Sequence, residues 1–153
     1  MAFGQPSLKG RALRLLAGRE HSRKELERKL AQHETEPGQL QAALDELQAK
    51  GFIDEQRVVD SLVHRRAGRL GAARIRQELQ AKGVDTERVA AAVAGLRATE
   101  LESARDVWRR KFGVVPADAA QRAKQARFLI ARGFSAESVR RVLAWDEADG
   151  GGS

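Results

Sequence analysis

The 153-residue chain contains no cysteine, which excludes a disulfide framework, a thiolate metal site and a cysteine nucleophile. No segment approaches the roughly 18 uninterrupted apolar residues of a membrane span. The opening MAFGQPSLKGR also lacks an apolar run of signal-peptide length. These absences predict a soluble cytoplasmic protein that does not interact with membranes.

Recognisable catalytic and cofactor motifs are also missing. Neither GxGxxG nor GxxxxGK[ST] occurs, and the three histidines, His21, His33 and His64, lie outside any HExxH-like spacing. We expect each histidine to be a surface or half-buried structural residue. The carboxylate pairs Asp54-Glu55 and Asp146-Glu147 fall at a helix cap and in a tail, where the helix dipole and solvation explain them. The sequence therefore predicts a binding protein, with no catalytic residue, metal site or cofactor.

Only three prolines occur, and alternating β-branched runs are absent, so an all-α fold is predicted. Residues 69–96 show the pattern most clearly. Ile75 and Leu79 share one helical face, Gly83 occupies the position of a C′ residue, and Asp85 can cap the following helix. The second helix of this pair should bury Val89, Val93 and Leu96.

The same pattern recurs with a period close to 50 residues. Moving it forward by 50 positions aligns it with Leu129, Gly133, Phe134, Glu137, Val139 and Leu143; moving it back by 49 aligns it with Leu26, Leu30, Leu40, Leu44 and Leu47. Periods of this length are typical of stacked helical modules that bury their apolar faces against one another. The sequence therefore predicts three tandem three-helix repeats in an elongated, curved array.

We place the repeats at residues 1–50, 51–97 and 98–145, followed by a disordered acidic and glycine-rich tail at 146–153. Residues 1–6 should also be disordered, and the terminal GGGS is either native or an addition. The third helix is expected to start at Pro37 and the eighth at Pro116, because proline is well tolerated at the first helical position. A separate helix is expected at Thr99–Phe112, and the last helix is expected to end near Trp145.

Positive charge is concentrated in two groups of residues. The net charge is +7, and residues 103–141 hold ten basic residues against three acidic ones. Such surfaces favour a polyanion or an acidic protein face, and the planar guanidinium of arginine suits phosphate and carboxylate. One predicted contact surface comprises Arg65, Arg66, Arg69, Arg74, Arg76 and Lys82; the other comprises Arg105, Arg109, Arg110, Lys111, Arg122, Lys124, Arg127 and Arg132.

Trp108 could stack on a nucleic-acid base beside the neighbouring arginines. However, Trp108 and Phe112 are four residues apart and coincide with Val58 and Leu62 in the repeat alignment. This spacing favours a core role for both aromatic residues.

Four stretches, in order and at consistent spacing, resemble the RecX family of regulators of the bacterial RecA recombinase. They are GFIDEQR at 51–57, RIRQELQAKGV at 74–84, ARDVWRRKF at 104–112 and RFLIARGFSAESVRRVL at 127–143. The resemblance implies a curved array that lies in the groove of the RecA filament on DNA, blocks its extension and dampens the ATPase, strand-exchange and repressor-cleavage (coprotease) activities of RecA. It further implies a protein without cofactor or catalytic centre. We expect a monomer that acts in DNA repair and the SOS response. We also expect it to bind single- and double-stranded DNA weakly and without sequence preference.

A helix-turn-helix transcription factor or nucleoid-associated protein remains the alternative, because two helices joined by a glycine turn also form that motif. Its recognition helix would be TERVAAAVAGL, which offers mainly alanine to base edges, where Arg, Asn or Gln are needed.

Overall fold

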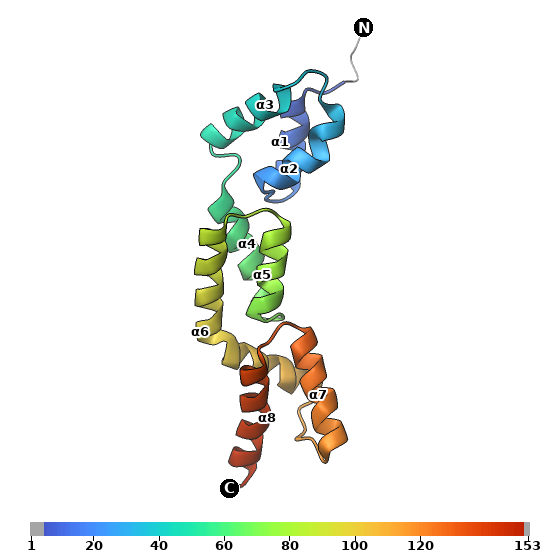
Figure 1. Cartoon of the computed structure of the whole chain (residues 1–153), viewed down its shortest axis with the longest axis vertical. Coiled ribbons are helices and arrows are strands. Elements are labelled where there is room, and N and C mark those ends of the chain that lie inside the picture. Colours follow the sequence, from blue (N-terminus) through green and yellow to red (C-terminus); the bar gives the residue numbers. More distant parts are fainter. Residues whose placement is uncertain (1–4, 152–153) are drawn as a thin grey trace.

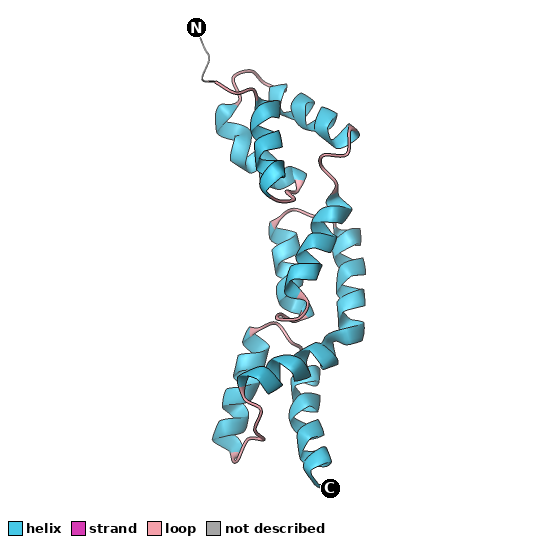
Figure 2. Cartoon of the chain, turned by 180° about the vertical axis from the view of Figure 1, so that it is seen from behind, coloured by secondary structure: helices cyan, strands magenta, loops and turns pink. Residues whose placement is uncertain are grey.

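Three small helical bundles follow one another along an elongated, gently curved molecule (Figure 1). The computed structural model describes residues 5–151, with side chains described from residue 5 to residue 144. Within this range all regular structure is helical, as the view from behind also shows (Figure 2). The predicted all-α fold of three tandem repeats is confirmed.

The first repeat begins at the N-cap Ser7, and its second helix has the capping box that the pattern of Ser22 with Glu25 three residues later predicts from the sequence. The Ser22 hydroxyl accepts from the Glu25 amide at 3.1 Å, and the Glu25 carboxylate accepts from the Ser22 amide at 3.1 Å. Its last helix starts at Gln39, so the predicted start at Pro37 is wrong: Pro37 lies in a turn, and Gly38, in the left-handed conformation, is the N-cap. The elements are α1 (Leu8–Gly18), α2 (Arg23–Leu30), the 3₁₀ turn η1 (Ala31–His33) and α3 (Gln39–Ala49).

The second repeat follows the predicted caps. Asp54 and Asp85 each accept a hydrogen bond from the backbone amide three residues later, at 3.0 and 2.9 Å. Gly83 has φ 75°, a left-handed conformation that glycine adopts without strain and that ends the preceding helix. The elements are α4 (Glu55–Arg66), α5 (Ala72–Ala81) and the first half of α6 (Thr86–Lys111).

The second and third repeats share α6, so the prediction of a separate helix at Thr99–Phe112 is wrong. Residues 96–99 contain neither proline nor glycine, and the helix continues through them. Figure 1 shows that α6 changes direction as it passes between the two repeats. A continuous helix thus replaces the expected loop at this junction.

The third repeat is completed by α7 (Ala119–Ala131) and α8 (Ala136–Gly151). The predicted start at Pro116 is wrong, because Asp118 caps α7 by accepting from the Gln121 amide at 2.8 Å. α8 continues to Gly151, beyond the expected end at Trp145, so residues 146–151 are helical where disorder was expected. The disorder expected at residues 1–4 and 152–153 lies outside the described residues.

Each repeat encloses its own apolar core. Leu26, Ile75 and Leu129 lie at the centres of the three cores and have no exposed surface. Ile53, which follows the expected boundary at residue 50, packs into the first core. The buried members of the cores are Leu8, Ala12, Leu26, Leu30, Leu40, Leu44, Leu47 and Ile53; Val58, Val59, Leu62, Ala72, Ile75, Leu79, Val84, Val89 and Val93; and Ala104, Val107, Trp108, Leu129, Phe134, Val139, Val142 and Leu143.

The two joints between repeats are built alike. At each joint an arginine of one repeat donates to a backbone carbonyl of the next repeat. Arg28 Nη1 donates to Ala81 O at 2.7 Å, and Arg74 Nη1 donates to Ala131 O at 2.8 Å. Each of these carbonyls lies two residues before the glycine that ends a helix, Gly83 or Gly133. These polar contacts fix neighbouring repeats relative to one another.

A carboxylate reinforces each joint. Glu55 accepts from the first amide of α2, on Arg23, at 3.0 Å. The buried Glu100 accepts from the first amide of α5, on Ala72, at 3.2 Å. Because a helix N-terminus carries unpaired N–H groups and positive dipole charge, each carboxylate stabilises the helix of the preceding repeat.

Candidate functional site

A cationic hollow lies at the joint between the second and third repeats. Its volume is about 240 Å³, and every charged residue that lines it is basic. We call it the basic hollow; its lining residues are Arg69, Val107, Arg110, Lys111, Phe128 and Arg132.

Helix ends position these cations. Arg110 and Lys111 occupy the last turn of α6, Arg132 is the C-cap of α7, and Arg69 lies in the turn before α5. Positive side chains are favoured at the negative end of a helix dipole. The joint therefore gathers basic residues from three separate segments of the sequence.

The aromatic ring of Phe128 packs beneath two of these basic side chains, Lys111 and Arg132. Lys111 Nζ lies 5.2 Å and Arg132 Cζ lies 4.8 Å from its ring centroid, which is a favourable cation–π geometry. Phe112 packs edge-on against the same ring at 5.4 Å. Arg110 Nη2 donates to Gly68 O at 2.8 Å, which holds that guanidinium over the joint.

This arrangement suits an anionic group. Guanidinium and ammonium groups bind phosphate or carboxylate oxygens through charge-assisted hydrogen bonds, and the lining supplies no carboxylate to compete. Over the residues that the structure describes, no group of three or more His, Asp or Glu side chains is placed to hold a metal ion.

Several residues predicted as contacts make contacts within the chain. Arg74 binds Ala131 O at the second joint. Lys82 Nζ lies 3.2 Å from Glu25 Oε1 at the first joint. Arg66 Nε lies 3.5 Å from Glu78 Oε2. These side chains connect repeats or helices, a role that charge clustering in the sequence did not indicate.

The remaining predicted residues lie on the second and third repeats, and members of the two predicted groups meet at the joint between these repeats. Arg69, from the first predicted group, joins Arg110, Lys111 and Arg132 from the second. Arg105 lines a hollow that also contains Glu100, Glu102 and Glu137. Arg76, on α5, lines an apolar groove between α5 and α6. Arg65 lies on α4 and Arg109 on α6, and α7 carries the remaining three residues, Arg122, Lys124 and Arg127.

Trp108 is a core residue, as its spacing predicted. Its side chain is 2% exposed, and its Nε1 donates to Gln125 Oε1 at 2.8 Å. Gln125 is itself buried and donates through Nε2 to Val114 O at 3.0 Å. Trp108 is therefore inaccessible to a base.

His21 is more buried than expected. Burial lowers its pKa, and the neighbouring charges of Arg19 and Lys29 act in the same direction. Its Nδ1 lies 3.0 Å from Arg19 O and its Nε2 lies 3.1 Å from Lys29 Nζ. Because a carbonyl oxygen accepts and an ammonium group donates, this geometry fits a ring that donates through Nδ1 and accepts through Nε2, which is a structural role. His33 is half-buried and His64 is exposed.

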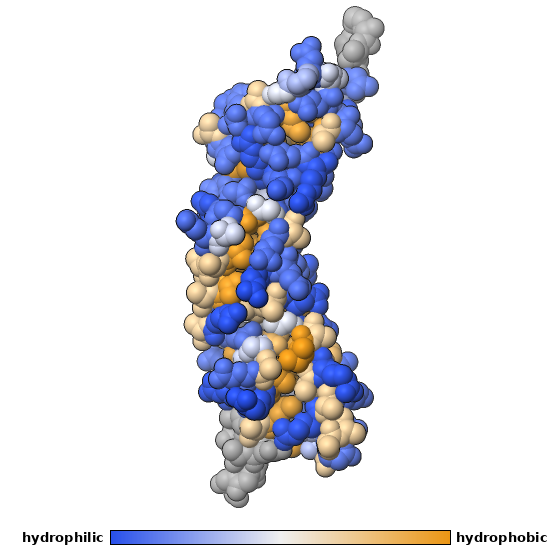
Figure 3. Space-filling view, in the orientation of Figure 1, coloured by the Kyte–Doolittle hydropathy of each residue, from blue (hydrophilic) through white to orange (hydrophobic). Residues whose placement is uncertain are grey.

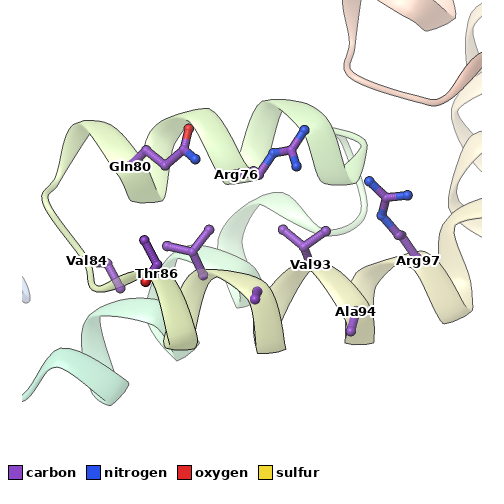
Figure 4. A pocket seen from close by; sticks show the side chains of 9 residues that line it. Arg76, Gln80, Val84, Thr86, Val93, Ala94 and Arg97 are labelled. Carbon is purple, nitrogen blue, oxygen red and sulfur yellow. The ribbon is translucent and has the colours of Figure 1, made fainter.

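An apolar groove that was not predicted from the sequence lies between α5 and α6 (Figure 4). Small side chains at Ala90 and Ala94 leave it open, and Arg97, absent from both predicted groups, lies beside Arg76 at one end. The pair of alanines four residues apart was the only sequence feature that could have indicated it.

Within residues 5–151, none of the helices combines the length and the apolar character that a membrane span requires.

Family models described as the first, second and third three-helix domains of RecX match residues 9–47, 54–93 and 98–143 in succession.

Relatives named Regulatory protein RecX align over nearly the whole chain. The protein of Leptothrix cholodnii is 58% identical over 145 residues, covering 94% of this chain and 92% of its own. That of Herminiimonas arsenicoxydans is 48% identical over 143 residues, covering 94% and 95%. The crystal structure of RecX from Lactobacillus salivarius has the same fold, with a TM-score of 0.76 at 19% identity over 90% of this chain and 92% of that one. The chain belongs to the RecX family of regulatory proteins.

Proposed function

We propose that this protein is a negative regulator of the RecA recombinase that lies along the groove of RecA–DNA filaments. It limits filament extension and thereby inhibits the ATPase, strand-exchange and coprotease activities of RecA. The observation that carries the proposal is the succession of three RecX domains over residues 9–143. Their end-to-end arrangement suits a long helical groove, because each repeat can follow a successive segment of a polymer (Figure 1).

The basic hollow supports an auxiliary affinity for DNA. Four cations around Phe128 can bind backbone phosphates, a contact that carries no sequence information. We infer weak binding to single- and double-stranded DNA that falls steeply with salt. The protein acts as a monomer by binding, without a catalytic step.

The experiment is RecA-dependent ATP hydrolysis on single-stranded DNA with the purified protein added in increasing amounts. Inhibition, with shorter filaments in electron micrographs, is the expected result. Unchanged hydrolysis at saturating protein contradicts the proposal.

The same preparation tests the helix-turn-helix alternative by footprinting on duplex DNA without RecA. In the structure, Ala90 and Ala94 of the would-be recognition helix line the α5–α6 groove and offer no hydrogen bond to a base. Protection of a defined sequence would favour the alternative, whereas weak, salt-sensitive binding without a footprint supports the RecA regulator.

A further inference from the structure

The central repeat carries an apolar groove of about 430 Å³ between α5 and α6. Figure 3 shows hydrophobic residues gathered between these helices, and Figure 4 shows their side chains directed into the space. We call it the central groove; its lining residues are Arg76, Gln80, Val84, Thr86, Val89, Ala90, Val93, Ala94 and Arg97.

The groove lies where a fourth helix would complete the bundle. α4 packs against both α5 and α6 but contributes no residue to the lining of the groove, so this side of the helix pair is left uncovered. Along α6 the lining extends from Thr86 to Arg97, which corresponds to about 16 Å of helix, or three turns. These dimensions match one partner helix packed between two others.

The first repeat closes the same position with its own side chains. There Arg23 bridges α2 and α3: its Nη1 donates to Gln48 Oε1 at 2.8 Å, and its Nη2 lies 2.6 Å from Asp45 Oδ1. At the period of 49 residues the counterpart of Arg23 is Ala72, and that of Asp45 is Ala94. The central repeat lacks the residues that bridge this space in the first repeat, so its groove is left open.

The third repeat also differs at the matching positions. At the period of 50 residues, Phe134 replaces Val84 and Arg140 replaces Ala90. Phe134 is buried in the third core. The third repeat thus carries a long, charged side chain at the position where the central repeat has Ala90.

The charges around the groove define the chemistry of its occupant. Arg76 on α5 and Arg97 on α6 lie together at the end away from Val84 (Figure 4). The lining contains no acidic residue. An occupant that places carboxylates at this end gains charge-assisted hydrogen bonds, while a basic one is repelled.

We propose that the central groove binds one amphipathic helix from the protein subunits of the filament, with carboxylates facing Arg76 and Arg97. The inference rests on the proposed function and adds the surface through which the partner protein is held. Helix-in-groove recognition uses apolar anchors spaced three or four residues apart, which the lining at positions 86, 89, 90, 93, 94 and 97 complements. Protein docking and phosphate binding are then carried by different surfaces, the central groove and the basic hollow.

The test compares Ala94→Glu and Arg97→Glu with Ala91→Glu. Ala91 is also exposed on α6 but lines the hollow on the α4 side, so the control carries the same substitution on the same helix. Unfolding transitions establish that the variants fold. Binding of the full-length chain to RecA filaments is measured by fluorescence anisotropy, and binding to free single-stranded DNA is measured in parallel.

Both groove variants should bind the filament at least about tenfold more weakly than Ala91→Glu. Ala94→Glu and Ala91→Glu, which carry equal charge, should bind free DNA equally. If the wild type binds filaments and the groove variants match the control, the groove inference is overturned and the proposed function stands. If the wild type does not bind filaments, both fail. A concentration-dependent dimer of the wild type that Ala94→Glu abolishes would instead identify a second copy of the chain as the occupant and would also overturn the inference.

Discussion

Gly71 lies against Gly133 so closely that a Cβ atom on Gly71 would come within 2.3 Å of the Gly133 carbonyl carbon. The Gly71 amide donates to Arg132 O at 2.8 Å, and Gly133 O accepts from the Ala73 amide at 3.2 Å. Backbone therefore meets backbone at the joint between the second and third repeats. The basic hollow lies at the same joint, since its lining residue Arg69 is two residues before Gly71 and its lining residue Arg132 directly precedes Gly133.

Gly71→Ala should destabilise the protein by about 1–3 kcal/mol, because the clash is with backbone and no side-chain rotation relieves it. The backbone at Gly71 is extended, with φ −81°, so the effect is steric and not conformational. Urea unfolding measures it. Gly95→Ala is the control: its Cβ meets nothing within 4 Å, and alanine within α6 should stabilise by about 0.5–1 kcal/mol. Equal stability of the two variants would show that the joint opens without cost.

Glu25 should make the first joint sensitive to acid. Partial burial opposes its ionisation, but hydrogen bonds from Arg19 and the Ser22 amide and the charge of Lys82 prevail and lower its pKa to about 2. A lowered folded-state pKa gives stability that is complete above the unfolded value near 4.5 and is lost as the pH falls towards 2.

Glu25→Gln should therefore cost on the order of 1–3 kcal/mol at pH 7 and progressively less between pH 4.5 and pH 2. Urea unfolding at several pH values measures the difference. The control is Glu87→Gln, which alters an exposed glutamate on α6. A difference between Glu25→Gln and wild type that stays constant with pH would contradict the assigned ion pairs.

Leu79→Ala and Leu129→Ala should each cost roughly 2–5 kcal/mol, because both side chains are fully buried at the centres of different cores. Since the two cores share no buried residue, the effects should add in the double variant. Thermal melts test this, with Ile130→Ala on the exposed side of α7 as the control. Neutral results for both leucines would contradict the assigned helix faces.

Gln125→Ala should cost about 1–3 kcal/mol, because it leaves the buried Trp108 N–H and the Val114 carbonyl without their partner. Chemical denaturation gives the loss. Gln121→Ala, at an exposed position on the same helix, provides the comparison. If both substitutions have the same small effect, the hydrogen bond to Trp108 contributes nothing to stability.

Lys111→Ala/Arg132→Ala should weaken DNA binding and reduce the slope of log K against log salt by about 1.4 on single-stranded DNA, if each cation contacts one phosphate. Fluorescence anisotropy at several salt concentrations measures the slope. Lys9→Ala/Arg14→Ala removes the same charge from α1 in the first repeat and should leave the slope nearly unchanged. Equal slopes for the two double variants would exclude the basic hollow as a phosphate site.

Particular residues show how far sequence reasoning extended. Ser22, Asp54 and Asp85 were identified as caps because each acts within four residues of itself, a range that local sequence describes. Pro37 and Pro116 were wrongly taken as helix starts, because Gly38 and Asp118 compete for the same role. The break expected before Thr99 does not exist, since no residue there interrupts helical hydrogen bonding.

The candidate sites depended on contacts between distant segments. Charge clustering directed attention to Arg69, Arg110, Lys111 and Arg132, which the structure brings together around one hollow, but it could not separate them from Arg74 and Lys82, which connect repeats. The central groove was missed because the sequence does not record that Arg23 bridges two helices in the first repeat. Its counterpart in the central repeat, Ala72, is too short to form such a bridge.

The sequence by itself determined the helical class, the threefold repeat and the central residues of each core, such as Leu26, Ile75 and Leu129, because helical periodicity and its 50-residue recurrence are properties of local spacing. The tertiary structure decided which arginines meet around Phe128, which cations hold repeats together, and where a groove stays open. These features arise where one repeat is packed and turned against the next, and that geometry depends on backbone contacts such as Gly71 with Gly133, which no pattern along a single chain records.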